Sequence, residues 1–118
     1  MKKKLKNYLI DIRPWGFEEI LTKNEKTTVK ILNIRPKKRN SLQTHKNRSE
    51  FWQILENNAK LTIGKKVIKA KPGDTFFIKK KELHRIQALD KQVKILEISF
   101  GKFNEKDIER KEDDFGRV

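Results

Sequence analysis

The chain has 118 residues, the size of one domain, and contains no cysteine. Disulfides and thiolate metal sites are therefore excluded, so a bound metal needs histidine, carboxylate, amide or water ligands. The 30 Lys and Arg residues outnumber the 16 Asp and Glu residues, and the net charge of +14 suits an anionic partner or a generally lysine-rich, solvated surface. No apolar run approaches the length of a membrane span, so we expect a protein of the cytoplasm without membrane contact.

The N-terminal part of the chain predicts short strands separated by turns. Residues 1–12 are expected to form a loose basic segment that leads into an edge strand, and a proline and a glycine favour a turn at 13–16. Trp15, within this turn, is expected to cover one end of the fold. The next strands, the second of them rich in β-branched residues, are predicted at 17–21 and 27–34.

The rest of the chain continues the same pattern. Further strands are predicted at 42–45, 51–55, 60–63, 66–69, 75–78, 85–89 and 93–100. The charged tail 104–118 is expected to hold one helical turn at 105–110. Since no segment repeats apolar residues at helical spacing over twelve or more positions, the pattern predicts an all-β sandwich or barrel that forms a single domain over 1–118.

Two stretches of the chain contain its two histidines and several other polar groups. Side chains alternate along a strand, so Gln43 and His45 share one face, as do Glu50 and Trp52 on the next strand. If these faces and that of His84 line one interior, an amide, two imidazoles and a carboxylate converge, which suits a divalent first-row metal with open positions for water or substrate. The alternative is that both histidines lie in loops or on the surface, and that Trp52 is an ordinary core residue.

The spacing of these residues resembles a known pair of motifs. Gln43-x-His45-x4-Glu50 resembles the first motif of the cupin superfamily, with Gln43 at the position of its first histidine. Gly73 and His84 fall in register with the second cupin motif. The resemblance implies a small cupin barrel, which is a jelly roll or double-stranded β-helix.

A closer resemblance extends over most of the chain. Several blocks are similar to the type II mannose-6-phosphate isomerase domain: 13–18, 29–30, 41–45, 48–52, 84–85, 107–110 and 114–117. That domain is usually the C-terminal part of a bifunctional enzyme that also contains a mannose-1-phosphate guanylyltransferase. The resemblance implies metal-dependent interconversion of mannose 6-phosphate and fructose 6-phosphate.

The resemblance also implies roles for individual residues. A divalent metal, zinc before manganese, iron, nickel or cobalt, is expected at Gln43, His45, Glu50 and His84. Glu50 and Arg48 are the expected catalytic residues, with Arg48 stabilising the substrate or an enediolate. A guanidinium binds phosphate oxygens in a bidentate manner, so arginines are the main candidates for binding the sugar phosphate. The residues expected to bind the substrate are Arg13, Arg48, Trp52, Arg85 and Arg117.

Departures from the family pattern leave other functions open. Asn47 and Phe51 stand where the family has histidines. They favour a second hypothesis, a non-catalytic cupin that binds a sugar phosphate or nucleotide sugar, acting beside a separate guanylyltransferase. A nucleic-acid-binding barrel is a third hypothesis, which is disfavoured because the lysine runs lack interleaved aromatic residues. A homodimer is expected by analogy with other cupins.

Overall fold

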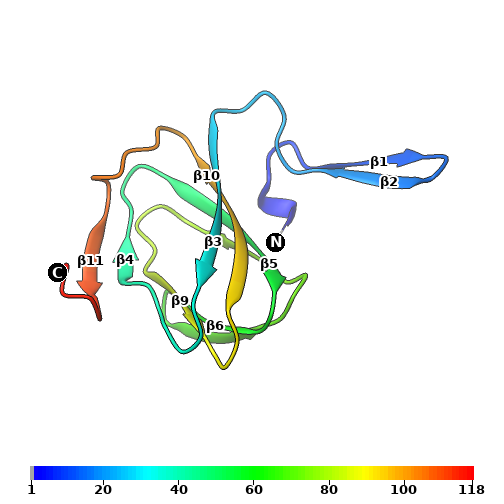
Figure 1. Cartoon of the computed structure of the whole chain (residues 1–118). Coiled ribbons are helices and arrows are strands. Elements are labelled where there is room, and N and C mark those ends of the chain that lie inside the picture. Colours follow the sequence, from blue (N-terminus) through cyan, green and yellow to red (C-terminus); the bar gives the residue numbers. More distant parts are fainter. Residues whose placement is uncertain (1) are drawn as a thin grey trace.

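The computed structural model describes residues 2–118 and consists almost entirely of short strands (Figure 1). Its elements are η1 (Lys2–Lys4), β1 (Leu9–Arg13), β2 (Gly16–Ile20), β3 (Thr27–Ile34), β4 (Leu42–Thr44), β5 (Ser49–Glu56), β6 (Ala59–Ile63), β7 (Lys66–Ala70), β8 (Thr75–Ile78), β9 (His84–Ala88), β10 (Val93–Phe100) and β11 (Glu109–Glu112). Within residues 2–118, no helix is long and apolar enough to cross a membrane.

Two antiparallel sheets face each other across the core. One sheet has the strand order β3-β10-β5-β8 and the other has the order β11-β4-β9-β6-β7. From β4 to β10 the chain passes repeatedly from one sheet to the other, which is the winding of a jelly roll. The predicted all-β cupin barrel is therefore confirmed.

The core follows from the two-residue alternation of the strands. Trp52 and Ile54 on β5 and Val93 and Ile95 on β10 point inward and are fully or almost fully buried. Phe51 points to the opposite face of β5, where it packs with other apolar side chains of the N-terminal segment and β10 in a second buried cluster. The interior near Trp52 is thus apolar at one end of the barrel and carries polar side chains at the other.

The N-terminal segment 1–12, expected to be loose, contains η1 and the start of β1. Leu5 is buried in the cluster that covers the outer face of β5, which ties this part of the segment to the barrel. From there β1 and β2 form a hairpin that projects from the barrel (Figure 1), in register from Leu9 with Ile20 to Arg13 with Gly16. The expectation that Trp15 covers one end of the fold is wrong, because it lies at the hairpin tip with 72% of its surface exposed.

The strands predicted at 27–34, 75–78 and 93–100 are confirmed residue for residue by β3, β8 and β10. The helical turn predicted at 105–110 is wrong, because the chain continues there into β11, which pairs with β4. Without β11, β4 would be an edge strand with unpaired backbone groups. The charged tail supplies the missing partner instead of forming a local turn.

Candidate metal centre and pocket

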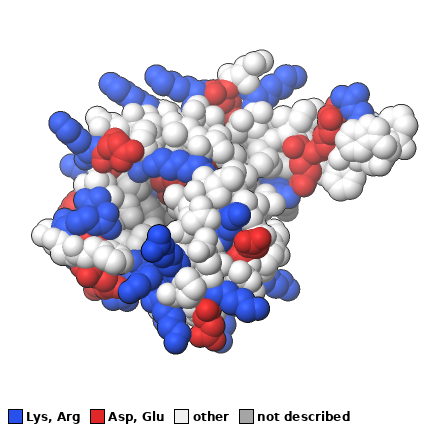
Figure 2. All heavy atoms as spheres, in the orientation of Figure 1, with Lys and Arg blue, Asp and Glu red and all other residues white. Residues whose placement is uncertain are grey.

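A pocket opens between the two sheets, and Figure 2 shows a hollow on this face of the molecule with Lys and Arg side chains around it. On the five-stranded sheet, Arg110 of β11 lies opposite Gln43 of β4, and Gln43 lies opposite His84 of β9. Residues that are opposite one another on neighbouring strands share a face. This row of three side chains therefore lines one wall of the pocket.

A second row lines the facing wall. Lys30 of β3 lies opposite Glu97 of β10, and Glu97 lies opposite Trp52 of β5. All three residues line the same pocket. The pocket therefore lies between two registered rows, each made of residues from three strands.

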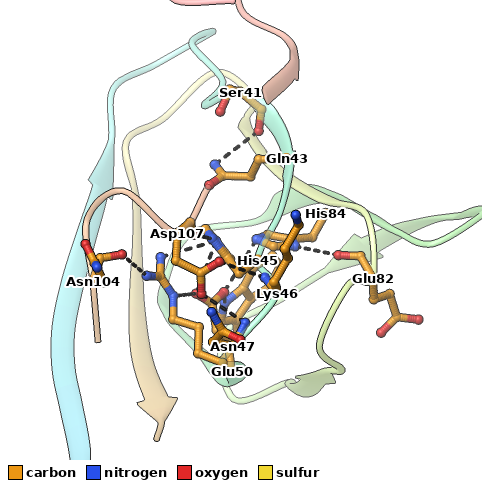
Figure 3. Close-up of polar contacts among 12 residues, drawn as sticks. Ser41, Gln43, His45, Lys46, Asn47, Glu50, Glu82, His84, Asn104 and Asp107 are labelled. Carbon is orange, nitrogen blue, oxygen red and sulfur yellow. Dashed lines mark hydrogen bonds and ion pairs between the residues drawn. The ribbon is translucent and has the colours of Figure 1, made fainter. Parts of the chain in front are cut away.

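His45, Glu50 and His84 converge at the bottom of the pocket (Figure 3). The Nε2 atom of His45 lies 3.6 Å from Oε2 of Glu50, and the Nε2 atom of His84 lies 3.6 Å from Oε1 of Glu50. One ligand atom from each residue falls within 4.8 Å of the others, and all three side chains are buried. The alternative of surface histidines is therefore excluded, and three of the four residues predicted to converge do so.

Each histidine is held in one tautomer by a backbone carbonyl. Nδ1 of His45 lies 2.6 Å from the carbonyl oxygen of Asp107, and Nδ1 of His84 lies 2.9 Å from that of Glu82. Because a carbonyl only accepts, each Nδ1 carries the proton and each Nε2 presents its lone pair to the site. Burial lowers the pKa of both histidines to about 4, so both rings are neutral at neutral pH.

Glu50 lies between these two neutral ring nitrogens, and Arg48 is the cationic side chain that contacts it. The Trp52 indole Nε1–H donates to Oε1 at 3.2 Å, and the Arg48 Nε–H donates to Oε2 at 3.4 Å. Burial raises the pKa of the Glu50 carboxyl, and the charge of Arg48 opposes that rise. Two neutral imidazoles and a buried carboxylate form a donor set that fits a divalent first-row metal.

Gln43, the fourth predicted ligand, lines the same pocket beside the two histidines (Figure 3). Its amide Nε2–H donates to the carbonyl oxygen of Ser41 at 3.3 Å. The amide nitrogen is engaged in this bond. The oxygen of Gln43 is the atom that can join the donor set.

Arg48 is buried at the site and held there by the tail. Its guanidinium lies 3.3 Å from Nε2 of His45, donates to the carbonyl oxygen of Asn104 at 3.2 Å, and lies 4.5 Å from the centre of the Phe103 ring. These contacts place a permanent cation beside the triad. Arg48 therefore lines the pocket, and its role toward a substrate stays a prediction.

Glu97 is a pocket residue that the sequence analysis missed. It is buried on β10, and burial together with the charge of Glu50 raises its pKa to about 7. A signal for it was present, because Val93, Ile95 and Ser99 alternate with outward residues on β10 and Glu97 occupies the same inward series. A carboxylate in the inward, buried series of a strand is an indication of a site residue.

The structure brings some of the predicted substrate-binding arginines to the pocket and not others. Arg117 lines the pocket, as do Arg48 and Trp52. Arg13 lies instead on the projecting hairpin, where it pairs with Asp11. The side chain of Arg85, on the opposite face of β9 from His84, donates to the Asn40 carbonyl and pairs with Glu112 at 3.1 Å.

The two departures from the family pattern also lie outside the pocket. Asn47 is exposed, and its backbone N–H donates to the carboxylate of Asp107 at 3.0 Å. Phe51 is fully buried on the outer face of β5, away from the triad. Neither substitution removes a group that lines the pocket.

A jelly-roll barrel with His45, Glu50 and His84 converging inside it defines a cupin. The chain belongs to the mannose-6-phosphate isomerase C-terminal family, whose model matches residues 2–113. This match confirms the family resemblance inferred from the sequence blocks.

The chain matches only part of each of its curated relatives. It is 31% identical over 114 residues to the alginate biosynthesis protein AlgA of Pseudomonas putida. That alignment covers 95% of this chain and 24% of AlgA. It is 29% identical over 108 residues to the mannose-1-phosphate guanylyltransferase ManC of Salmonella typhimurium. That alignment covers 90% of this chain and 22% of ManC. The chain thus spans about a quarter of the length of these curated relatives.

The fold has a close structural neighbour. A cupin 2 domain-containing protein from Halorhodospira halophila superposes with a TM-score of 0.67, over 87% of this chain and 80% of that chain, at 14% sequence identity. This likeness supports the cupin fold.

Proposed function

We propose that the chain is a metal-dependent sugar-phosphate isomerase that interconverts mannose 6-phosphate and fructose 6-phosphate. The observation that supports this most is the buried His45–Glu50–His84 centre beside Arg48, in a chain of the mannose-6-phosphate isomerase C-terminal family. The cationic side chains of the pocket suit an anionic substrate.

The isomerisation moves one proton from C2 to C1 of the open-chain sugar and a second from the oxygen on C2 to the oxygen on C1, and it passes through an enediolate. A divalent metal held by His45, Glu50 and His84, with Gln43 as a fourth ligand, would supply Lewis-acid stabilisation of that negative charge. Zinc is the first candidate, followed by manganese, iron, nickel and cobalt. Arg48 adds guanidinium N–H donors for the same oxygens.

The proton carrier must be a further group, because both oxygens of Glu50 face histidine nitrogens. Glu97 is a buried carboxylate that lines the pocket next to Trp52 in register. We assign to it the proton transfer between the two carbons. Glu50, expected from the sequence to be catalytic, acts in this proposal by holding the metal.

The test is a turnover assay of the purified protein with each candidate metal added in turn. Formation of fructose 6-phosphate from mannose 6-phosphate is followed by coupled oxidation and by NMR. Turnover that depends on metal and disappears with a chelator supports the proposal. A metal-loaded protein that binds the sugar phosphate without turning it over, in an assay where a known isomerase is active, contradicts it.

The alternative function is a non-catalytic cupin that binds a sugar phosphate or nucleotide sugar. Asn47 and Phe51 favoured it in the sequence, but both lie outside the pocket. The relationship to guanylyltransferases makes a separate guanylyltransferase a reasonable partner for either function. Copurification with such an enzyme tests the partnership independently of turnover.

We also propose a homodimer that uses the projecting hairpin. The hairpin exposes large hydrophobic side chains: Leu9, Ile10, Ile12, Trp15 and Phe17. A cluster of this kind on a protruding arm usually marks an interaction surface. Light scattering of the wild type and of Ile12→Asp measures the mass directly, and a monomeric wild type contradicts the dimer. The cytoplasmic location remains a prediction of the sequence.

A further inference from the structure

The pocket has a second end, away from the histidines, that the proposed chemistry does not use. Ser41, Gln43 and His45 form the inward series of the β4 segment, and all three line the pocket. A step of two residues along a strand covers about 6.7 Å. The wall therefore extends from His45 at the metal centre, past Gln43, to Ser41 at the far end.

The part of the wall at and beyond Gln43 contains hydrogen-bond donors without acceptors. Among the described residues, neither the buried Nε of Arg110 nor the buried Oγ of Ser41 has a hydrogen-bond partner. Arg110 lies opposite Gln43 in the pairing of β11 with β4, one two-residue step from His45. A buried guanidinium N–H without an acceptor is costly, so these groups indicate a ligand that accepts hydrogen bonds.

The charges around Arg110 favour an anion as that ligand. Lys30 and Arg117 also line the pocket, and the ammonium of Lys30 lies 4.3 Å from the centre of the Phe103 ring. Arg117 is paired with Asp113 through two contacts of 2.7 and 3.2 Å, so its charge is largely compensated locally. Glu105 is a lining carboxylate that reduces the positive charge of this region. Within residues 2–118, the buried Nε of Arg110 has no acceptor of this kind.

From these observations we infer that Arg110 and Ser41, supported by Arg117 and Lys30, form a binding site for a phosphomonoester. Arg110 donates its N–H groups to the phosphate oxygens, and the Ser41 hydroxyl donates one more. The inference rests on the proposed function for the orientation of the sugar. A hexose 6-phosphate with C1 and C2 at the metal centre has its phosphate at the other end of its carbon chain, toward Arg110.

The experiment measures binding to the metal-loaded protein by calorimetry, with mannose 6-phosphate, inorganic phosphate and unphosphorylated mannose as probes. Arg110→Met removes the charge and the donors while retaining an unbranched side chain. Lys111→Gln is the matched control, because Lys111 is the next residue on β11, is exposed, and pairs outward with Glu109. Ser41→Ala tests the hydroxyl separately.

We expect Arg110→Met to weaken mannose 6-phosphate and phosphate binding by about tenfold or more, and Lys111→Gln to change it by less than about twofold. Ser41→Ala weakens phosphate binding by about threefold to tenfold. Arg110→Met with wild-type affinity and metal content overturns the inference, as does an equal loss in Lys111→Gln. If Arg110→Met does not fold, wild-type phosphate affinity in Ser41→Ala overturns it instead.

The same measurements separate this inference from the proposed isomerase. Phosphate binding that depends on Arg110, in a protein without turnover, leaves the phosphate site in place and removes the isomerase. Turnover with an unchanged KM for mannose 6-phosphate in Arg110→Met leaves the isomerase in place and removes the phosphate site.

Discussion

The two ends of the pocket are built in different ways. At one end, His45, Glu50 and His84 are buried, neutral or acidic, and fixed by backbone carbonyls and the indole of Trp52. At the other end, Arg110 is cationic and its Nε lacks a partner among the residues described. The first end is complete as a donor set for a cation, whereas the second is a set of donors for an anion. A substrate that carries a phosphate at one end and two metal-binding oxygens at the other matches both ends of the pocket.

The largest effect is expected from breaking the histidine end. His45→Ala removes one of the three donors that converge on the site, so we expect loss of stoichiometric metal and a fall in turnover of at least about 100-fold. Metal analysis of the purified variant and the turnover assay measure the two effects. Asn47→Ala is the control, because Asn47 is exposed two residues away. A variant that retains its metal would show that the three side chains do not form the centre.

The next effect concerns the carboxylate that lies between the two ends. Glu97→Gln keeps the size of the side chain and removes its ability to accept a proton, so we expect kcat to fall by about 100-fold or more. The metal content and the affinity for mannose 6-phosphate stay close to those of the wild type. Glu105→Gln, a substitution of the same type at an exposed lining residue, should leave kcat almost unchanged. Wild-type kcat in Glu97→Gln would assign the proton transfer to another group.

The ease with which each end is found in the sequence also differs. The alternation of strands fixes His45 relative to Gln43 and Glu50 relative to Trp52, so these side chains could be placed on common faces from spacing alone. Arg110 could not be placed in this way, because its position depends on pairing between β11 and the distant β4. The charged composition of the tail favoured a helical turn locally. The strand forms instead because its backbone pairs with the otherwise open edge of β4.

The arginines show the same limit. Arg85 follows His84 directly, so alternation already directs it to the other face of β9, where it pairs with Glu112. Arg13 lies on a hairpin whose direction depends on how the chain leaves the barrel. Glu97, in contrast, could have been found, since it is the only charged residue in the inward series of β10.

A smaller effect is expected on the stability of the metal-free protein. The pKa of Glu97 is about 7 in the folded protein, against about 4.5 unfolded, so between these values the folded state binds more protons and its stability falls as the pH rises. Glu97→Gln removes this pH-dependent loss of stability and leaves the two histidines unchanged. The variant should therefore gain about 2–4 kcal/mol of unfolding free energy relative to the wild type between pH 4.5 and 8. Urea unfolding in a chelator at both pH values measures the difference, and a difference independent of pH would contradict it.

The smallest effect is expected from restoring a family residue. Asn47→His introduces the histidine that the family has at this position. The hypothesis of a non-catalytic cupin assumed that the chain is inactive because it lacks this histidine. Because Asn47 is exposed and held away from the pocket by its backbone bond to Asp107, the new ring has no path to the metal centre. We expect metal content, KM and kcat to stay within about twofold of the wild type, a range typical of surface substitutions. A large gain in turnover would show that the loop at 46–48 closes over the pocket when substrate binds, and that the family histidine acts from there.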